Sequence, residues 1–179
     1  EIDYRWAEGR IDRLAPMAND LVRRQVAVLV ATGGARAALA AKAATASIPI
    51  VFTSGGDPVE NGLVNSLSRP SGNLTGVTLI TRQLESKRLA LLHETLPQAK
   101  TFALLTNPGV ASMAASVKEV EGVARRLGLR LVVLKAQSAS EFEAVFQSLV
   151  RLGAEGLVVS SDPFFNSRRG QIVELAARH

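Results

Sequence analysis

The sequence contains no cysteine. This absence excludes structural disulfides, catalysis by a thiolate and zinc sites built on cysteine, and it fits any cellular compartment. Aromatic residues make up only 4% of the 179 residues. No apolar run approaches the roughly 18 residues that a membrane-spanning helix needs. What is present is an ordinary globular composition, with 47% hydrophobic and 21% charged residues, in a chain long enough to bury a sizeable core.

Signatures of the common enzyme classes are also absent from the sequence. Neither the dinucleotide-binding pattern G-x-G-x-x-G nor the phosphate-binding P-loop occurs. Ser54 follows a predicted strand, but its surroundings lack the first glycine of the G-x-S-x-G elbow. The two histidines, His93 in a predicted helix and His179 at the last position, are not placed to act as its base. We therefore predict that the chain is not an enzyme and has no catalytic residue, no metal ligand and no cofactor.

Positive charge exceeds negative charge, but it does not gather in one place. The 21 lysines and arginines outnumber 16 acidic residues, which gives a formal net charge of +5. Short basic pairs such as Arg23-Arg24 and Arg125-Arg126 fall in predicted helices, where they are typical of a solvated face. Binding to nucleic acid depends on a clustered patch and not on the total charge, so we predict no nucleic-acid partner.

Apolar runs of strand length alternate with amphipathic stretches along the whole chain. The expected strands are Ile2–Trp6, Ala27–Ala31, Ile48–Phe52, Thr75–Leu79, Thr101–Thr106, Leu131–Leu134 and Gly156–Ser160. The expected helices are Ile11–Val22, Ala35–Ala46, Val59–Leu67, Leu84–Leu96 and Met113–Leu127. A sixth helix is expected to follow a capping box formed by Ser140 and Glu143. After a loop over Asp162–Arg169, a last helix is expected from about Gly170. This alternation predicts an α/β fold with parallel sheets covered by helices on both faces.

The strand-and-helix rhythm restarts after Pro97, which indicates two Rossmann-like lobes. We expect the first lobe over residues 1–80 and the second over residues 81–179, with Leu84–Leu96 as the crossover between them. In open parallel sheets, ligands bind beyond the carboxyl ends of the strands. That rule selects four polar loops, which are Thr32–Gly34, Thr53–Pro58, Thr106–Gly109 and Ser160–Asn166.

Helix N-termini follow these loops, and their free N–H groups favour a carboxylate or a similar anion. The candidate ligand-binding residues in the loops are Gly33, Gly34, Ser54, Asp57, Asn107, Asp162 and Phe164. A plainer interpretation exists for each type of residue. The two aspartates, each followed by proline, also fit an N-cap, and the glycines also fit tight turns. Of the neighbours Phe164 and Phe165, either one packs inward and the other meets a ligand, or both are buried.

Residues 57–77, with the sequence DPVENGLVNSLSRPSGNLTGV, are very similar to the signature of ABC-transporter substrate-binding proteins of the type I periplasmic fold. The segment looks like the group linked to aromatic amino-acid uptake, although Ser71 stands where the usual form has glycine. Shorter segments that also fit this family are Ile2–Trp6, Ile48–Phe52, Thr106–Pro108 and Asp162–Phe164. The resemblance covers the whole chain.

The resemblance implies two lobes that close on a small molecule, an amino acid or another carboxylate, and that deliver it to an ABC permease. It also implies a periplasmic or an exported, membrane-anchored location, with the signal segment outside this chain. Backbone N–H groups, together with Ser54 or Asn107, are then expected to hold a carboxylate. Asp57 or Asp162 is expected to accept hydrogen bonds from an amino group, and Phe164 to supply an apolar contact.

Members of the family begin with a further strand and helix and continue past Leu175 with further strands. The resemblance therefore implies a first lobe without its first strand and helix and a second lobe incomplete at its C-terminus. The absent strand would lie between Ile2–Trp6 and Ala27–Ala31, which leaves an unpaired edge. We expect either disorder near Glu1 or a dimer formed through that edge.

Two other functions share this fold class. One is the effector-binding domain of a lactose-repressor-like regulator, which a DNA-binding segment upstream of Glu1 would identify. The other is a small Rossmann-like transferase, which turnover of a substrate would identify. Fold alone does not decide between a binding protein, a regulator and an enzyme.

Overall fold

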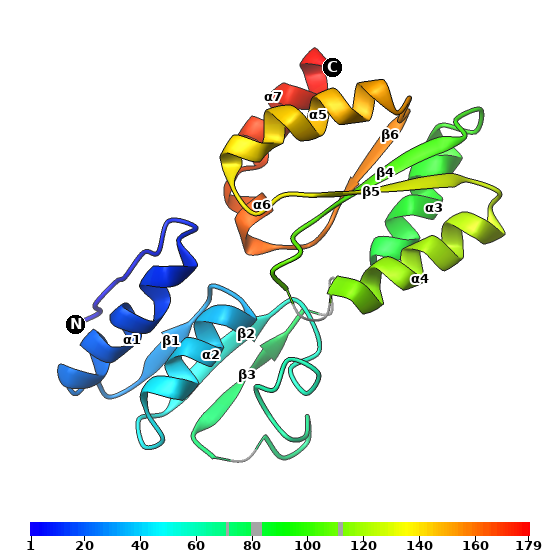
Figure 1. Cartoon of the computed structure of the whole chain (residues 1–179). Coiled ribbons are helices and arrows are strands. Elements are labelled where there is room, and N and C mark those ends of the chain that lie inside the picture. Colours follow the sequence, from blue (N-terminus) through cyan, green and yellow to red (C-terminus); the bar gives the residue numbers. More distant parts are fainter. Residues whose placement is uncertain (71, 80–83, 111–112) are drawn as a thin grey trace. The chain divides into compact units, whose positions relative to one another are not determined.

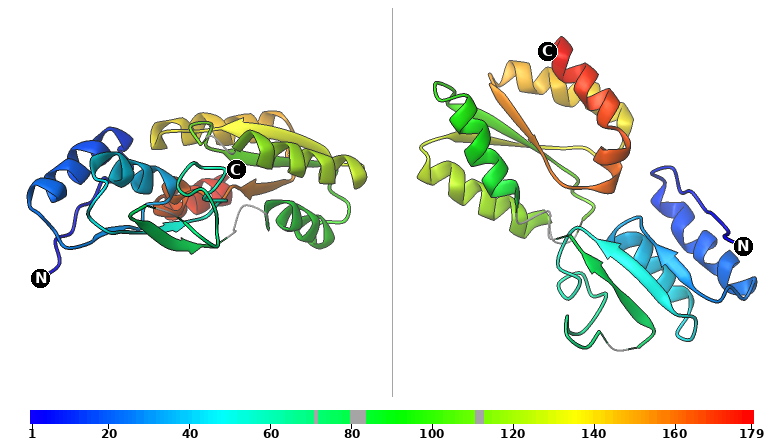
Figure 2. Two further views of the ribbon diagram at one scale, coloured as in Figure 1. Left: turned by 90° about the horizontal axis from the view of Figure 1, so that it is seen from below. Right: turned by 180° about the vertical axis from the view of Figure 1, so that it is seen from behind.

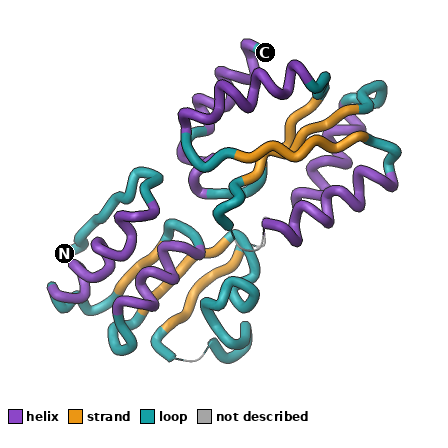
Figure 3. The backbone as a smooth tube through the Cα atoms, viewed as in Figure 1, coloured by secondary structure: helices purple, strands orange, loops and turns teal. Residues whose placement is uncertain are grey.

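The computed structural model describes residues 1–70, 72–79, 84–110 and 113–179 (Figure 1). The chain divides into two compact units, Glu1–Ile80 and Thr81–His179. Helices and strands alternate in both units (Figure 3), and each unit holds a parallel three-stranded sheet. The prediction of an α/β fold with two parallel sheets is confirmed. Ser71, where the sequence departs from the family signature, lies outside the described residues.

The first unit is built around a sheet with the strand order β1-β2-β3. Its elements are a 3-10 turn η1 (Ile11–Arg13), α1 (Leu14–Arg23), β1 (Leu29–Ala31), α2 (Ala35–Ala44), β2 (Ile50–Ser54) and β3 (Leu74–Thr78). β1 and β3 both pair with β2 in parallel, so the carboxyl ends of all three strands lie at one edge of the sheet.

In the described part of the first unit, helices cover one face of this sheet and leave the other open. Leu29, Ile50 and Phe52 point to the covered face and pack with residues of α1, α2 and the loop before β3. Val30 and Val77, on the opposite face, leave 68% and 59% of their surface exposed. The prediction of helices on both faces is therefore wrong for the described part of this unit. The reason is that α1 and α2 pack against each other on the same side of the sheet.

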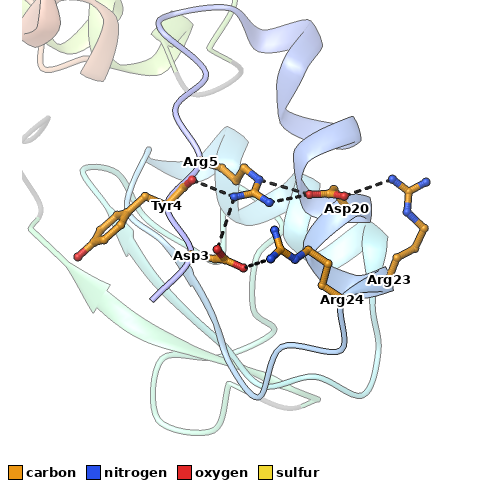
Figure 4. Close-up of polar contacts among 6 residues, drawn as sticks. All are labelled: Asp3, Tyr4, Arg5, Asp20, Arg23 and Arg24. Atoms are coloured by element: carbon orange, nitrogen blue, oxygen red, sulfur yellow. Dashed lines mark hydrogen bonds and ion pairs between the residues drawn. The ribbon is translucent and has the colours of Figure 1, made fainter. Parts of the chain in front are cut away.

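The segment Ile2–Trp6, which was expected to be a strand, forms no strand. It has no strand partner among the described residues, and a strand exists only through such pairing. Figure 4 shows how it is held instead: the Arg5 guanidinium lies 2.8 Å from the Asp20 carboxylate of α1, and Asp3 lies 3.0 Å from Arg24. These ion pairs hold the segment against α1, and the Trp6 side chain is exposed to solvent.

The expected helix over Val59–Leu67 is also wrong. Only one helical turn forms, in which the Asn61 N–H donates to the Asp57 carbonyl oxygen at 3.0 Å. Gly62 then adopts a φ of +70°, a left-handed conformation that ends the turn. Leu63 and Val64 enter the core of the first unit from the loop that follows.

The second unit has the strand order β5-β4-β6. Its elements are α3 (Glu85–Thr95), β4 (Thr101–Thr106), α4 (Met113–Arg126), β5 (Arg130–Lys135), a 3-10 turn η3 (Ala139–Glu141), α5 (Phe142–Arg151), β6 (Gly156–Val159), α6 (Pro163–Ser167) and α7 (Arg169–Arg178). The right view of Figure 2 shows α3 and α4 on one side of the sheet and α5 and α7 on the other. The expected crossover helix is α3, which belongs to this unit.

The central strand β4 explains these three layers. Phe102 and Leu104 pack with residues of α3 and α4, whereas Ala103 and Leu105 pack with residues of α5 and α7. All four are fully buried. Coverage of both faces, as predicted from the continuous apolar run, is confirmed for this unit. Gly156 of β6 permits the close packing, since a Cβ atom there would lie 2.8 Å from the Phe102 ring.

Two helix starts in the second unit differ from the expected ones. The capping box is formed by Ser138 and Glu141, two residues before the predicted pair Ser140/Glu143. The segment Asp162–Arg169, expected to be a loop, contains the short helix α6. Here the N-cap interpretation of Asp162 is confirmed, because its carboxylate accepts a hydrogen bond from the Phe164 N–H.

Candidate functional site

In the first unit, the candidate residues gather at the carboxyl edge of the sheet. Because Ala31 of β1 lies opposite Phe52 of β2, the loops that follow these strands are neighbours. Gly34 forms the N-cap of α2 with a φ of +81°, a conformation that favours glycine. No side chain of the described residues caps this helix, and free N–H groups at a helix start favour an anionic group.

Ser54 lies at this edge but is occupied within its own loop. Its hydroxyl donates to the Gly56 carbonyl oxygen at 3.0 Å and accepts from the Gly56 N–H at 3.3 Å. Thr78 of β3 donates to the same carbonyl oxygen at 3.0 Å. Ser54 is buried, so in this arrangement it shapes the loop and offers no free hydroxyl to a ligand.

Asp57 acts as a cap in the same loop. One of its carboxylate oxygens, Oδ1, accepts hydrogen bonds from the N–H groups of Val59 at 2.7 Å and Glu60 at 3.3 Å. The plainer interpretation of this aspartate therefore fits its geometry. A contact between its second oxygen and a ligand stays a prediction.

In the second unit, the fold brings Asn107 and Asp162 together from positions 55 residues apart. β4 and β6 are parallel neighbours, so the residues that follow them meet at the carboxyl edge. The Asn107 amide donates to Asp162 Oδ1 over 3.3 Å, and its own Oδ1 accepts from the Gly109 N–H at 3.1 Å. The two residues are only 5% and 6% exposed. The fold therefore brings two of the predicted site residues into one buried polar pair, and their contact with a ligand stays a prediction.

Phe164 lies beside this pair, at the start of α6. Its ring centroid is 5.5 Å from that of Phe142 and 5.3 Å from that of Phe165. Phe165 is buried in the core of the unit, whereas Phe164 is half-buried. Phe165 thus packs inward, and part of the Phe164 side chain is exposed to solvent. Contact of this exposed part with a ligand stays a prediction.

A second polar cluster at this edge, which was not predicted from the sequence, consists of Glu85, Ser116, Ser160 and Ser161. Glu85, the first residue of α3, is completely buried. Its two oxygens accept from the Ser116 hydroxyl at 2.6 Å and the Ser161 N–H at 2.9 Å. The Ser160 hydroxyl is buried and has no hydrogen-bond partner among the described residues. One signal was available, since Glu85 precedes the buried Leu89 by four residues and so shares its helix face.

Shifted pKa values occur at other places in the chain. The N–H groups of Thr101 and Lys100 hydrogen-bond to Glu155, at the amino-end edge of the second sheet, and lower the pKa of its carboxylate. In the first unit, hydrogen bonding to Arg5 lowers the pKa of Asp20. No group of three or more potential metal ligands occurs among the described residues, and none of the described helices is suited by length and hydropathy to cross a membrane.

A curated relative and two solved structures resemble this chain. A tyrosine-binding protein from Clostridioides difficile is 28% identical over 171 residues, which cover 91% of this chain and 48% of the relative. A conserved domain protein from Vibrio cholerae has a TM-score of 0.85 at 26% identity, over 99% of this chain and 59% of that one. An ABC domain from Streptococcus pneumonia in complex with L-Trp has a TM-score of 0.84 at 23% identity, over 99% and 60%.

The chain thus spans about half the length of the curated relative and about three fifths of these solved structures. The likeness to the L-Trp complex establishes the fold alone, because the identity is low. The family model for ABC transporter substrate binding proteins matches residues 1–178, nearly the whole chain. This match confirms the family indicated by the sequence segment 57–77 and the prediction that the chain is not an enzyme. The chain belongs to the family of ABC transporter substrate binding proteins.

Proposed function

We propose that this chain captures an amino acid, and an aromatic one in particular, for uptake by an ABC importer. The buried Asn107–Asp162 pair at the carboxyl edge of the second sheet carries the proposal. Burying an amide and a carboxylate side by side is costly unless their hydrogen-bonding capacity is used. The printed name of the curated relative, a tyrosine-binding protein, supports the choice of ligand class.

The carboxyl edge of each sheet, taken by itself, offers groups that suit one part of an amino acid. The N-terminus of α2, at Gly34, has no side-chain cap among the described residues and favours the carboxylate through its N–H groups. Among the described residues, Asn107 and the Phe164 N–H both bond to Oδ1 of Asp162, and we assign its Oδ2 to an ammonium group of the ligand. The open part of Phe164 offers an apolar contact for the ligand side chain.

Family membership supports the partner and the location. A substrate-binding protein of this family delivers its ligand to an ABC permease, so the proposed site of action is outside the cytoplasmic membrane. Binding of the ligand would then favour the state that the permease accepts.

Titration of the chain with amino acids tests the proposal. Calorimetry and thermal unfolding followed by circular dichroism would be run with L-tyrosine, L-tryptophan, L-phenylalanine, L-leucine and benzoate. A ligand at 100 times its dissociation constant is expected to add about 2.7 kcal/mol to the free energy of unfolding. Stabilisation by none of these probes would refute the amino-acid assignment.

Two matched variants locate the site. Asp162→Asn keeps an acceptor for the N-cap but removes the charge, so we expect weaker binding of amino acids and unchanged binding of benzoate, which lacks an ammonium group. Glu119→Gln removes an exposed charge from α4 and is expected to leave both affinities unchanged. An equal effect of both variants would contradict the role given to Asp162.

A further inference from the structure

The buried carboxylate of Glu85 is the least expected feature of the second unit. A carboxyl side chain that is 0% exposed loses its hydration, and the partners that Glu85 has among the described residues, Ser116 and Ser161, are not basic. Two described features offset this loss: the N-terminus of α3, where the helix dipole favours negative charge, and two short hydrogen bonds. An apolar residue would fill this position at lower cost if packing were its only purpose.

The two bonds of Glu85 join three separate segments. Oε2 accepts from the Ser116 hydroxyl of α4 at 2.6 Å, and Oε1 accepts from the Ser161 N–H at 2.9 Å. Ser161 lies between the end of β6 and the start of α6, directly before Asp162. The first turn of α3 holds Ser161 a second time, since Arg88 donates to its hydroxyl at 2.8 Å.

We infer that Glu85 is a positioning residue for ligand binding, because it fixes the loop 160–162 that presents Asp162 and leads into Phe164. The inference rests on the proposed function. Asp162 is held on one side by Asn107, and the peptide before it is held by Glu85. Loss of the Glu85 bond frees the backbone of Ser161, so the Asp162 carboxylate no longer keeps one orientation toward the ammonium group of an amino acid.

Four variants of the whole chain separate positioning from general stability. Glu85→Ala removes both bonds, Ser116→Ala removes only the bond to α4, and Arg88→Met removes only the bond to the Ser161 hydroxyl. Glu85→Gln is the conservative variant. Its amide oxygen can accept from the Ser161 N–H while its NH2 group donates to Ser116, so both links survive.

Two readouts are required, one with ligand and one without. We expect Glu85→Ala to weaken binding of L-tyrosine or L-tryptophan by about tenfold, the effect that loss of one charge-assisted hydrogen bond has on an equilibrium. Glu85→Gln should restore most of the affinity. Without ligand, hydrogen exchange of the 160–167 amides should be faster in Glu85→Ala and unchanged in Ser116→Ala.

The outcomes are distinguishable from a failure of the proposed function. If the unsubstituted chain binds no amino acid, the proposed function is wrong and no positioning for it exists, whatever the exchange rates show. If the chain binds and Glu85→Ala matches Ser116→Ala in both affinity and exchange, Glu85 only stabilises the fold and the inference is overturned. If Glu85→Ala does not fold, the variant Arg88→Met, at an exposed position, is used instead. We expect it to bind the amino acid more weakly and to show faster hydrogen exchange at the Ser161 amide. No change in either measurement would refute the inference.

Discussion

Replacing Gly156 by alanine tests the packing of β6 against the central strand. The added Cβ atom would lie 2.8 Å from two atoms of the Phe102 ring and 3.1 Å from a methyl carbon of Leu92. Real Cβ atoms essentially never approach other atoms within 3.0 Å, so the strand or the ring must shift, and Phe102 is fully buried on the central strand. Overpacking of this kind costs about 1–3 kcal/mol of the free energy of unfolding.

A second glycine supplies the matched control. Gly170 lies in α7, and a Cβ atom there would meet nothing within 4 Å. Gly170→Ala is therefore expected to stabilise the unit by roughly 0.5–1 kcal/mol, the difference in helix propensity between the two residues. The two substitutions are chemically identical, so their opposite signs would isolate the effect of close packing.

Urea unfolding is the assay, and the position of the fluorophores decides how it is followed. The single tryptophan and the single tyrosine are both in the N-terminal segment, so fluorescence reports on the first unit alone. Circular dichroism at helix wavelengths also follows the second unit. A Gly156→Ala midpoint equal to or above that of the unsubstituted chain would refute the reasoning, and rescue by Phe102→Leu in the same chain would strengthen it.

Three further outcomes are expected. Hydrogen bonds from the Thr101 and Lys100 N–H groups hold the pKa of Glu155 below its ordinary value of 4.5. The stability that these bonds contribute is therefore complete above that value and is lost as the pH falls through the lower pKa of the folded state. When the urea midpoint is measured against pH, Glu155→Gln should reduce its fall in this acid range. Phe164→Leu should weaken binding of aromatic amino acids about threefold to tenfold and leave leucine nearly unaffected, as calorimetry would show. Pairing of two copies through the open edge of β1 should give a dimer in light scattering that Val30→Lys dissociates, and a monomer for the unsubstituted chain at high concentration would exclude it.

The sequence predicted the elements whose local pattern and tertiary surroundings agree. β4 was expected over Thr101–Thr106 and has these bounds, because its continuous apolar run is buried on both faces. The apolar run in β1 is buried on one face of the sheet only. Its own residues could not predict this, because whether a helix covers a sheet face depends on parts of the chain outside the strand. The prediction of a strand over Ile2–Trp6 was wrong for a similar reason. An alternating pattern favours a strand, but it cannot supply the neighbouring strand with which it must pair.

The candidate site was predicted by position and not by role. Topology alone placed Asn107 and Asp162 at one sheet edge, and their contact follows from the parallel pairing of β4 with β6. Ser54 was also placed correctly at an edge, yet its hydroxyl is used by Gly56 two residues on, a local bond that composition does not reveal. Glu85 was missed because a glutamate in the first turn of a helix is normally exposed.

The bare valine face of the first sheet changes how this chain can be screened. Dyes such as ANS fluoresce when they bind exposed apolar surface, and Val30, Val51 and Val77 offer such a surface in the folded state. A thermal shift measured with such a dye would start from a high signal and give a shallow transition, as if the native chain were partly molten. Ligand screens of this chain are therefore better read by calorimetry or circular dichroism, in which the valine face adds no background.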